Sequence, residues 1–171
     1  MIIKGKSFSL RPYRKDDKYS LTKNLNDEKI SRFMCTVPYP YRIKDAEKFL
    51  DKCLKLSRNK NKNEINMAID KDSEVIGGIG FREIEGHRSE LGYWIARKHW
   101  NSGIMTEAIR LFTKLGFKKL KFRRIQAHVN TKNKASARVL EKNNYKREGL
   151  LRKFQNKDGK FIDCYLYAKI R

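Results

Sequence analysis

The order of apolar and polar positions divides the chain into short strands and amphipathic helices. Alternation, which is typical of a half-buried strand, occurs first at residues 7–11 and ends at Pro12. The two prolines of residues 37–41 exclude regular structure there and predict an extended segment. Apolar positions at helical spacing predict three helical segments in this part of the chain, at residues 16–26, 28–33 and 45–57.

The rest of the chain predicts a sheet whose strands alternate with helices. Polar turns separate three consecutive strand patterns, at residues 65–69, 75–84 and 90–96. Two helices and three further strands follow, with the helices at residues 104–120 and 135–143 and the strands at 124–129, 145–152 and 161–170. This order predicts a mixed α/β fold, in one domain that covers residues 1–171.

Composition limits the class of protein. An apolar content of 39%, with 11% aromatic residues, supports a packed core, and no apolar run is long enough to span a membrane. The first ten residues lack the apolar stretch of a secretory signal, so we expect a cytoplasmic protein. The three cysteines and three histidines follow no ligand spacing, and we therefore expect reduced packing thiols and no metal site.

The net charge is high, because 41 Lys and Arg residues outnumber 19 Asp and Glu residues and give +22. One interpretation is a polyanionic partner such as RNA or the ribosome. The other is a lysine-rich genome, with lysines solvated on helix faces. The densest basic cluster lies at residues 118–124, but basic residues occur along the whole chain, which favours the second interpretation. The charge also argues against polycationic acceptors such as polyamines.

The segment that points to chemistry is a strand that runs through a short turn directly into a helix, at residues 90–108. The first amides of such a helix have no backbone partner and carry the positive end of the helix dipole. Gly103 allows a ligand to approach the backbone closely, so the helix start suits a pyrophosphate. A tight turn is the simpler interpretation of the same glycine.

Motifs in and around this segment carry a family resemblance. Tyr93-Trp94-Ile95, followed by Trp100-x-x-Gly103-x-x-Thr106-Glu107-Ala108, resembles the coenzyme-A segment of the GNAT acetyltransferases. It is most similar to the branch that includes the ribosomal-protein N-terminal (alanine/serine) acetyltransferases. Weaker motifs in the family's order extend the resemblance over nearly the full length, at residues 10–12, 37–41, 45–47, 133–142, 148–149 and 159–163.

The resemblance implies a GNAT fold, in which a central, mostly antiparallel, splayed β-sheet is flanked by helices. It also implies acetyl-coenzyme A as the cofactor, with pantetheine in the gap between two strands and pyrophosphate on the helix start. The residues that it assigns to the cofactor are Tyr93, Trp94, Ile95, Ala96, Asn101, Ser102, Gly103, Ile104, Met105, Thr106, Asn133, Ser136 and Lys142. Asn133 and Ser136 are also common helix-start residues, and the two roles are compatible.

The chain departs from the family pattern at several positions. Asn101 and Met105 stand where the family usually has Gly, and Gly or Ala. Backbone amides persist with any side chain, so we expect binding to survive, although the bulk of Met105 could crowd the loop. Leu140 stands where many members place a tyrosine that protonates the leaving thiolate. We expect Ser136 or Tyr145 to supply that acid, although Tyr145 itself belongs to a pair that replaces the usual Gly-Phe.

The implied reaction is direct attack of a neutral amine on the thioester in a ternary complex. An α-amine has a pKa of ~7.7–8.0 and a lysine ~10.4, so near pH 7.5 roughly a quarter of the former and ~0.1% of the latter is neutral. This difference favours a protein N-terminus as the acceptor.

Glu90 is the first candidate for the general base. The alternative interpretation of Glu90 is a surface carboxylate in an ion pair with Arg88 or Arg97. His128 is the second, because a free imidazole titrates at about 6.5, although a lone strand histidine is usually structural.

Four further residues are candidates for the acceptor site. Tyr39, Tyr41 and Trp94 could form its wall, although aromatic residues beside a sheet are more often core. Asp163 could line the same pocket or pair with Lys160. Two other functions stay open: acetylation of a small-molecule amine, and a non-catalytic module that binds coenzyme A or RNA. We expect a monomer or a homodimer.

Overall fold

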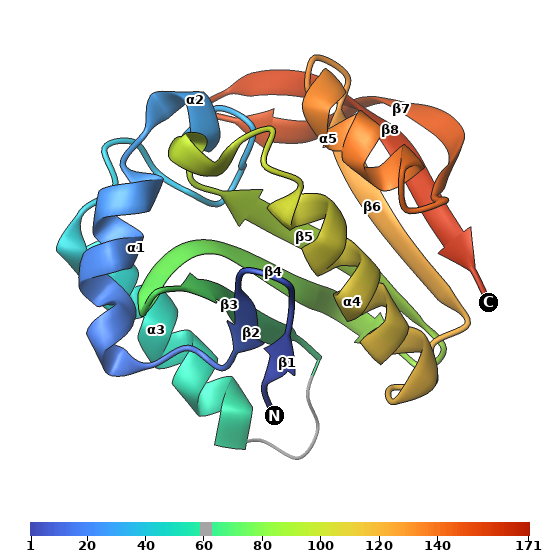
Figure 1. Ribbon diagram of the computed structural model, residues 1–171. Coiled ribbons are helices and arrows are strands. Elements are labelled where there is room, and N and C mark those ends of the chain that lie inside the picture. The colour runs from blue at the N-terminus through green and yellow to red at the C-terminus, as the bar shows by residue number, and fades with distance from the viewer. Residues whose placement is uncertain (59–62) are drawn as a thin grey trace.

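The computed structural model describes residues 1–58 and 63–171, which form an eight-stranded sheet with helices on both faces (Figure 1). The strands lie in the order β1-β2-β3-β4-β5-β6-β8-β7, and all neighbours are antiparallel except β5 and β6. This arrangement confirms the mixed α/β fold with a mostly antiparallel sheet. The strands are β1 Ile3–Lys4, β2 Ser9–Arg11, β3 Ile65–Lys71, β4 Glu74–Glu85, β5 Arg88–Ile95, β6 Arg124–Asn130, β7 Lys146–Lys157 and β8 Lys160–Ile170.

The helices agree with the predicted pattern apart from their ends. They are α1 Lys18–Leu25, α2 Glu28–Ser31, α3 Ile43–Arg58, α4 Ile104–Lys118 and α5 Lys134–Glu141, with 3-10 turns η1 Lys15–Asp17 and η2 Arg97–His99. Two differences stand out. The short strand β1 was not predicted, because two residues are too few to show a period. The closing hairpin is longer than predicted, since β7 continues five residues past residue 152.

The sheet separates two apolar cores, as the alternation within its strands requires. On one face, Phe81 stacks on Phe112 of α4 at 4.3 Å between ring centroids and meets Phe122 edge-on at 5.2 Å. On the other face, α1 and α3 cover β3 and β4. Neighbouring residues of β3 divide between the cores, with Met67 and Ile69 facing α4 and Ala68 facing α3.

A buried arginine connects the first strands to the helices. Arg11 is 5% exposed and donates to both carboxylate oxygens of Asp17, at 2.9 and 2.8 Å. Its Nε and Nη2 also donate to Asp70 on β3, at 2.8 and 2.6 Å. The hydrogen bonds to Asp17 and Asp70 raise the pKa of Arg11 further against the opposing effect of burial. The opening motif at residues 10–17 therefore stabilises the junction of β2, η1 and β3.

The parallel pair opens after three residues. Arg88, Ser89 and Glu90 of β5 pair with Arg124, Ile125 and Gln126 of β6, and no register beyond these pairs joins the two strands. β5 nevertheless continues to Ile95 and β6 to Asn130, so the strands diverge, as Figure 1 shows. The last five residues of β5 therefore make no backbone pairs with β6, and among them the Ile95 carbonyl accepts from the indole Nε1 of Trp100 at 3.0 Å. The α5 helix lies beside the open end of β6 in the same view.

Candidate active site

The turn between β5 and α4 leaves a helix start open to a ligand. Gly103 is the N-cap of α4 with φ of +80°, and it has no side chain to cap the helix. The first bond of the helix runs from the Glu107 amide to the Gly103 carbonyl at 3.1 Å, so the three amides before Glu107 lie outside the ladder. A Cβ placed on Gly103 would meet no atom within 4 Å, so the space beside the backbone is open. This geometry suits the pyrophosphate of coenzyme A.

The two departures from the family's loop have different physical consequences. Asn101 has φ of +60°, in the left-handed region that favours glycine and that asparagine adopts more readily than most residues. This conformation accounts for the glycine that relatives usually carry there. Met105 is 7% exposed and packs into the core under α4. The expectation that Met105 could crowd the loop is wrong, because its side chain points into the protein.

The second predicted cofactor element lies at the ends of α5. Asn133 caps the helix by accepting from the Ser136 amide at 3.1 Å, which confirms its role at a helix start. At the other end, Asn143 donates to the Thr106 carbonyl at 3.1 Å. This contact joins the end of α5 to the first turn of α4. Lys142, which precedes Asn143, is exposed at the same end of α5.

The two candidate bases form one hydrogen-bonded unit. His128 Nδ1 lies 3.1 Å from Glu90 Oε2, and their side chains are only 8% and 4% exposed. The guanidinium of Arg82 contacts the other carboxylate oxygen, with Nε at 3.1 Å from Oε1. Burial raises the pKa of Glu90, but the hydrogen bond to His128 and the charge of Arg82 outweigh it and hold that pKa below its usual range. Glu90 is therefore ionised near neutral pH.

The ion pairs proposed for Glu90 from the sequence are wrong. Arg88 pairs instead with Glu85, and Arg97 pairs with Asp27 at 2.8 Å between Nε and Oδ2. Glu90 takes Arg82 because the two residues are direct cross-strand partners in the β4–β5 hairpin. Equal counting outward from the predicted turn at residues 85–88 would place Glu90 opposite Glu83, which is one residue from Arg82. A bulge between residues 82 and 85 then decides which side chains share a face.

Two residues beside this pair were missed from the sequence. Phe154 of β7 lies over the His128 ring at 4.4 Å between centroids, and its side chain is 49% exposed. Gly92 follows Glu90 by two residues and so shares its face of β5; a Cβ there would meet nothing within 4 Å. Open space thus lies next to the buried pair, on the face of the sheet opposite α4. No sequence motif marks either residue.

The predicted acceptor residues do not gather into one pocket. Tyr41 is 5% exposed and belongs to the core beneath α1 and α3, which Trp94 also contacts, so the alternative reading as core holds for both. Tyr39 is 54% exposed. Asp163 is exposed and accepts from the Lys153 amide at 2.7 Å, within the β7–β8 hairpin, rather than pairing with Lys160.

Ser136 and Tyr145, the two candidates for the general acid, lie in different surroundings. Tyr145 is 2% exposed, and its hydroxyl lies 2.8 Å from the Thr113 hydroxyl of α4, within the core. Leu140 is fully buried in the same core. Ser136 lies in the first turn of α5, with its Oγ 2.7 Å from the hydroxyl of Tyr93. Tyr145 therefore packs against α4, whereas Ser136 faces the phenol of a splayed strand.

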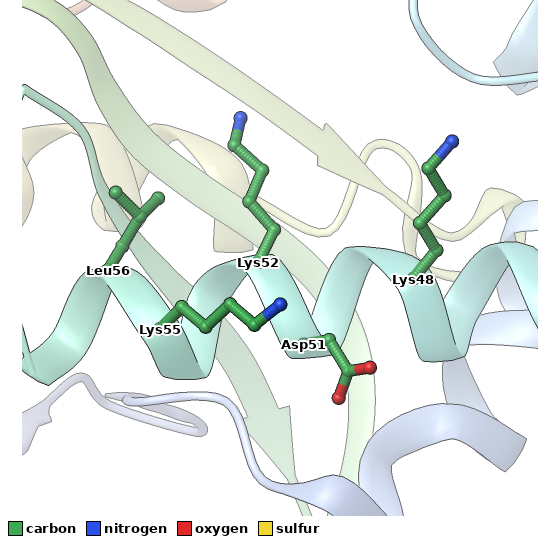
Figure 2. Close-up of a pocket in the computed structure, with 5 residues that line it drawn as sticks. All are labelled: Lys48, Asp51, Lys52, Lys55 and Leu56. Carbon is green, nitrogen blue, oxygen red and sulfur yellow. The ribbon is translucent and has the colours of Figure 1, made fainter.

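A shallow depression elsewhere on the surface has a different character. Figure 2 shows that its residues all come from α3: Lys48, Asp51, Lys52, Lys55 and Leu56. Lys52 is paired with Glu64 at 2.6 Å between Nζ and Oε2. Because one helix supplies all of these side chains and the Glu90–His128 pair is not among them, we interpret the depression as a solvated helix surface. Across the described ranges, no set of His, Cys, Asp and Glu residues is arranged to hold a metal, and no helix is long and apolar enough to cross a membrane.

Comparison with known proteins identifies the class that this fold and site define. Residues 8–146 match the family described as the acetyltransferase (GNAT) domain, and the chain belongs to this family. It is 29% identical over 165 residues to p20, an uncharacterized N-acetyltransferase of Bacillus licheniformis, covering 95% of this chain and 92% of p20. It is 30% identical over 102 residues to the ribosomal-protein-serine acetyltransferase of Escherichia coli (strain K12), covering 58% and 57%.

A solved structure agrees with the fold. The ribosomal L7/L12 alpha-N-protein acetyltransferase RimL, in complex with coenzyme A, superposes with a TM-score of 0.86 at 20% identity, covering 99% of this chain and 98% of RimL. Membership of the acetyltransferase (GNAT) family makes this protein an acetyl-CoA-dependent acetyltransferase. The open helix start at Gly103 and the unpaired end of β5 fit that cofactor.

Proposed function

We propose that this enzyme transfers an acetyl group from acetyl-CoA to the α-amine of a protein N-terminus, with the Glu90–His128 pair as its general base. The observation that carries the proposal is the 3.1 Å contact between these two buried side chains. Glu90 is the last residue of β5 that pairs with β6, and His128 lies two residues past the last paired residue of β6. Two relatives support the acceptor class, because they are named for acetylating ribosomal proteins.

The donor half of the reaction uses mainly backbone. Acetyl-CoA supplies an activated thioester when bound. The free amides at the start of α4 would hold its pyrophosphate, and those backbone groups of residues 93–96 that face the splay would pair with its pantetheine arm. Asn133 and Ser136 would contact the same arm from α5, and Lys142 would lie near the phosphates. These expected contacts come from α4, from α5 and from the part of β5 that does not pair with β6.

The acceptor half uses the buried pair. Because Glu90 accepts from Nδ1–H of His128, the neutral ring presents Nε2 as its acceptor nitrogen. Nε2 takes a proton from the amine as its nitrogen attacks the thioester carbon. The ionised Glu90 then stabilises the positive ring, as a carboxylate behind a catalytic histidine does. Roughly a quarter of an α-amine is already neutral near pH 7.5, so an N-terminal acceptor needs only modest help from a base.

An acceptor screen tests the proposal. Purified enzyme with acetyl-CoA is offered unblocked peptides that begin with serine or alanine, and thiol release and peptide mass are measured. The matched control is each peptide with a blocked N-terminus and one internal lysine. We expect acetylation of the unblocked peptides only. Turnover confined to small amines would establish the small-molecule alternative, and binding of acetyl-CoA without any turnover would establish the non-catalytic one.

The proposal extends to contact with the ribosome, on the basis of the +22 charge. Its densest basic segment, residues 118–124, joins the end of α4 to β6. We expect co-sedimentation with ribosomes that weakens steeply as salt rises, since phosphate contacts release counterions. Replacing Lys118, Lys119 and Lys121 by glutamine should reduce that binding more than the same change at Lys48, Lys52 and Lys55 of α3. Equal effects of the two triple changes would assign the binding to general basicity.

A further inference from the structure

Phe154 reaches His128 because β7 is irregular at this point. Between two positions that pair with β8, β7 carries the three residues 152–154, where β8 has only Asp163. A bulge of this kind bends a strand and redirects its side chains. Here it brings Phe154 over the His128 ring, at 4.4 Å between centroids and 36° between the ring planes.

Asp163 holds this bulge in shape. Its Oδ1 accepts from the Lys153 amide at 2.7 Å, and Lys153 has φ of +52°, in the left-handed region that residues other than glycine adopt at a cost. The Asp163 carbonyl accepts from the Thr131 amide at 3.1 Å, directly after β6, the strand that carries His128. Asp163 therefore joins the bulge of β7 to the strand of the candidate base.

The loop after α2 anchors the other side of the bulge. Lys157 Nζ donates to the carbonyls of Met34 and Val37, at 2.9 and 3.0 Å. Cys35 Sγ donates to Gln155 Oε1 at 3.2 Å. The residues that follow the bulge are thus held as firmly as those within it, and we expect the Phe154 ring to stay in place.

The exposed part of the Phe154 ring is an apolar surface beside the base. The ring is 49% exposed, whereas the His128 side chain next to it is 8% exposed. Gly92 leaves open space on the same face of the sheet. An amine that gives its proton to His128 Nε2 must come within about 3 Å of that atom. The first side chain of the acceptor begins two bonds from the amine nitrogen, so it lies within reach of the ring.

We propose that Phe154 is a specificity-determining residue for the acceptor, and that Asp163 is the positioning residue that holds its ring beside His128. The ring forms the wall against which the first side chain of the acceptor packs. Contact with the ring removes water from that side chain, which favours an apolar group and costs a hydroxyl its hydrogen bonds to water. The substrate class is therefore an α-amine whose first residue is apolar rather than hydroxylated or charged. This inference rests on the proposed function, because it requires the acceptor amine to lie at His128.

Peptides that differ only in their first residue test this wall. Valine and threonine have nearly the same shape, so the ratio of their kcat/KM values measures the polarity of the wall apart from its size. We expect the wild type to prefer valine about tenfold, which is less than a closed apolar pocket achieves. Phe154→Ala should bring the two values together, and Phe154→Leu, which keeps an apolar side chain, should preserve most of the preference.

The same hairpin supplies the controls. Phe161 of β8 is 64% exposed, close to the β7–β8 turn, so Phe161→Ala removes another exposed ring and should leave the ratio unchanged. Asp163→Ala should lower the ratio, because the Lys153 amide loses its acceptor. Asp163→Asn should keep the ratio, because an amide oxygen can still accept that bond.

A second readout needs no turnover: calorimetric binding of the valine and threonine peptides to the protein loaded with coenzyme A. A valine preference that Phe154→Ala leaves unchanged, or equal use of both peptides by the wild type, would overturn the inference and leave the proposed function standing. Tighter binding of the valine peptide that depends on Phe154, without acetylation of either peptide, would refute the proposed function and uphold the wall. A wild type that neither binds nor acetylates the peptides would overturn both.

Discussion

The loop before α4 and the Glu90–His128 pair both adjoin the splay between β5 and β6 but are built in different ways. The loop is contiguous, from Arg97 to Thr106, and presents backbone groups. The pair is assembled from side chains of β5 and β6, with Arg82 from β4 and Phe154 from β7 around it. We expect a backbone site to tolerate substitution, including Asn101 and Met105 at their positions in this loop. A side-chain site depends on each of its members.

This difference predicts that the two regions fail separately. Changes in the loop should abolish cofactor binding and leave the base intact, and changes in the pair should do the reverse.

The largest effect is expected for Gly103→Glu. The variant places a negative side chain where the pyrophosphate would bind and forces a non-glycine residue to adopt φ of +80°. A ligand at about 100 times its Kd stabilises a protein by about 2.7 kcal/mol, and we expect this stabilisation by acetyl-CoA to vanish in a thermal melt. Gly159→Glu is the control, because Gly159 has φ of +79° and an equally open Cβ position in the β7–β8 turn. An unchanged response of Gly103→Glu would exclude the loop from the binding site.

Next in size is His128→Asn. Removing the proton acceptor should lower kcat with a peptide acceptor about 10²–10³-fold, within the usual range for a general base. The shift in melting temperature produced by acetyl-CoA should stay the same, because the loop is untouched. His87→Asn, at an exposed turn position, is the control. Full activity of His128→Asn would remove His128 from the mechanism.

A smaller effect is expected for Glu90→Gln. The amide can still accept a hydrogen bond from His128 but no longer stabilises its positive form, so kcat should fall, and by less than in His128→Asn because the base itself is retained. Adding Glu90→Gln to His128→Asn should cost little more, because the two residues act as a unit. Glu85→Gln, which changes an exposed carboxylate of the same hairpin, is the matched control. A double variant with multiplied losses would show that Glu90 acts on the acceptor independently of His128.

The smallest effect is expected for Glu74 of β4, which accepts hydrogen bonds from Asn24 of α1 and from Lys98 in the turn before α4. Hydrogen bonds from Lys98 of η2 and Asn24 of α1 lower the pKa of Glu74 to about 2 against the opposing effect of burial. A lowered folded-state pKa contributes stability above the unfolded value of about 4.3, and this stability is lost as pH falls towards 2.

Glu74→Gln should therefore lower the free energy of unfolding by about 1 kcal/mol at pH 7, since the partly exposed pair is screened by solvent. The difference from wild type should disappear by pH 2 in denaturant titrations. Glu47→Gln, which removes a more exposed pair with Lys18, should change stability less at every pH. A difference at pH 7 that persisted unchanged at pH 2 would show that charge is not its cause.

Local signals explain which parts of the fold could be predicted. The long helices and central strands follow from periods of 3.6 and 2 within short windows. The strand β1, the 3-10 start at Lys15–Asp17 and the length of β7 could not be predicted, because tertiary pairing determines them. The candidate phosphate loop could be proposed from Gly103 and its neighbours, since a strand, a turn and a helix start lie within one stretch of sequence.

The sequence by itself determined the fold class, the family motifs and the candidate cofactor loop, because these depend on neighbours along the chain. It also supplied Glu90 and His128, but as competing candidates. Only the tertiary structure decided that these two residues are hydrogen-bonded to each other and that Arg82, rather than Arg88, is the partner of Glu90. It also decided that the Tyr145 hydroxyl pairs with Thr113 in the core, whereas the Tyr93 hydroxyl pairs with Ser136. Strand register and side-chain direction set these contacts, and both depend on residues far apart in the sequence.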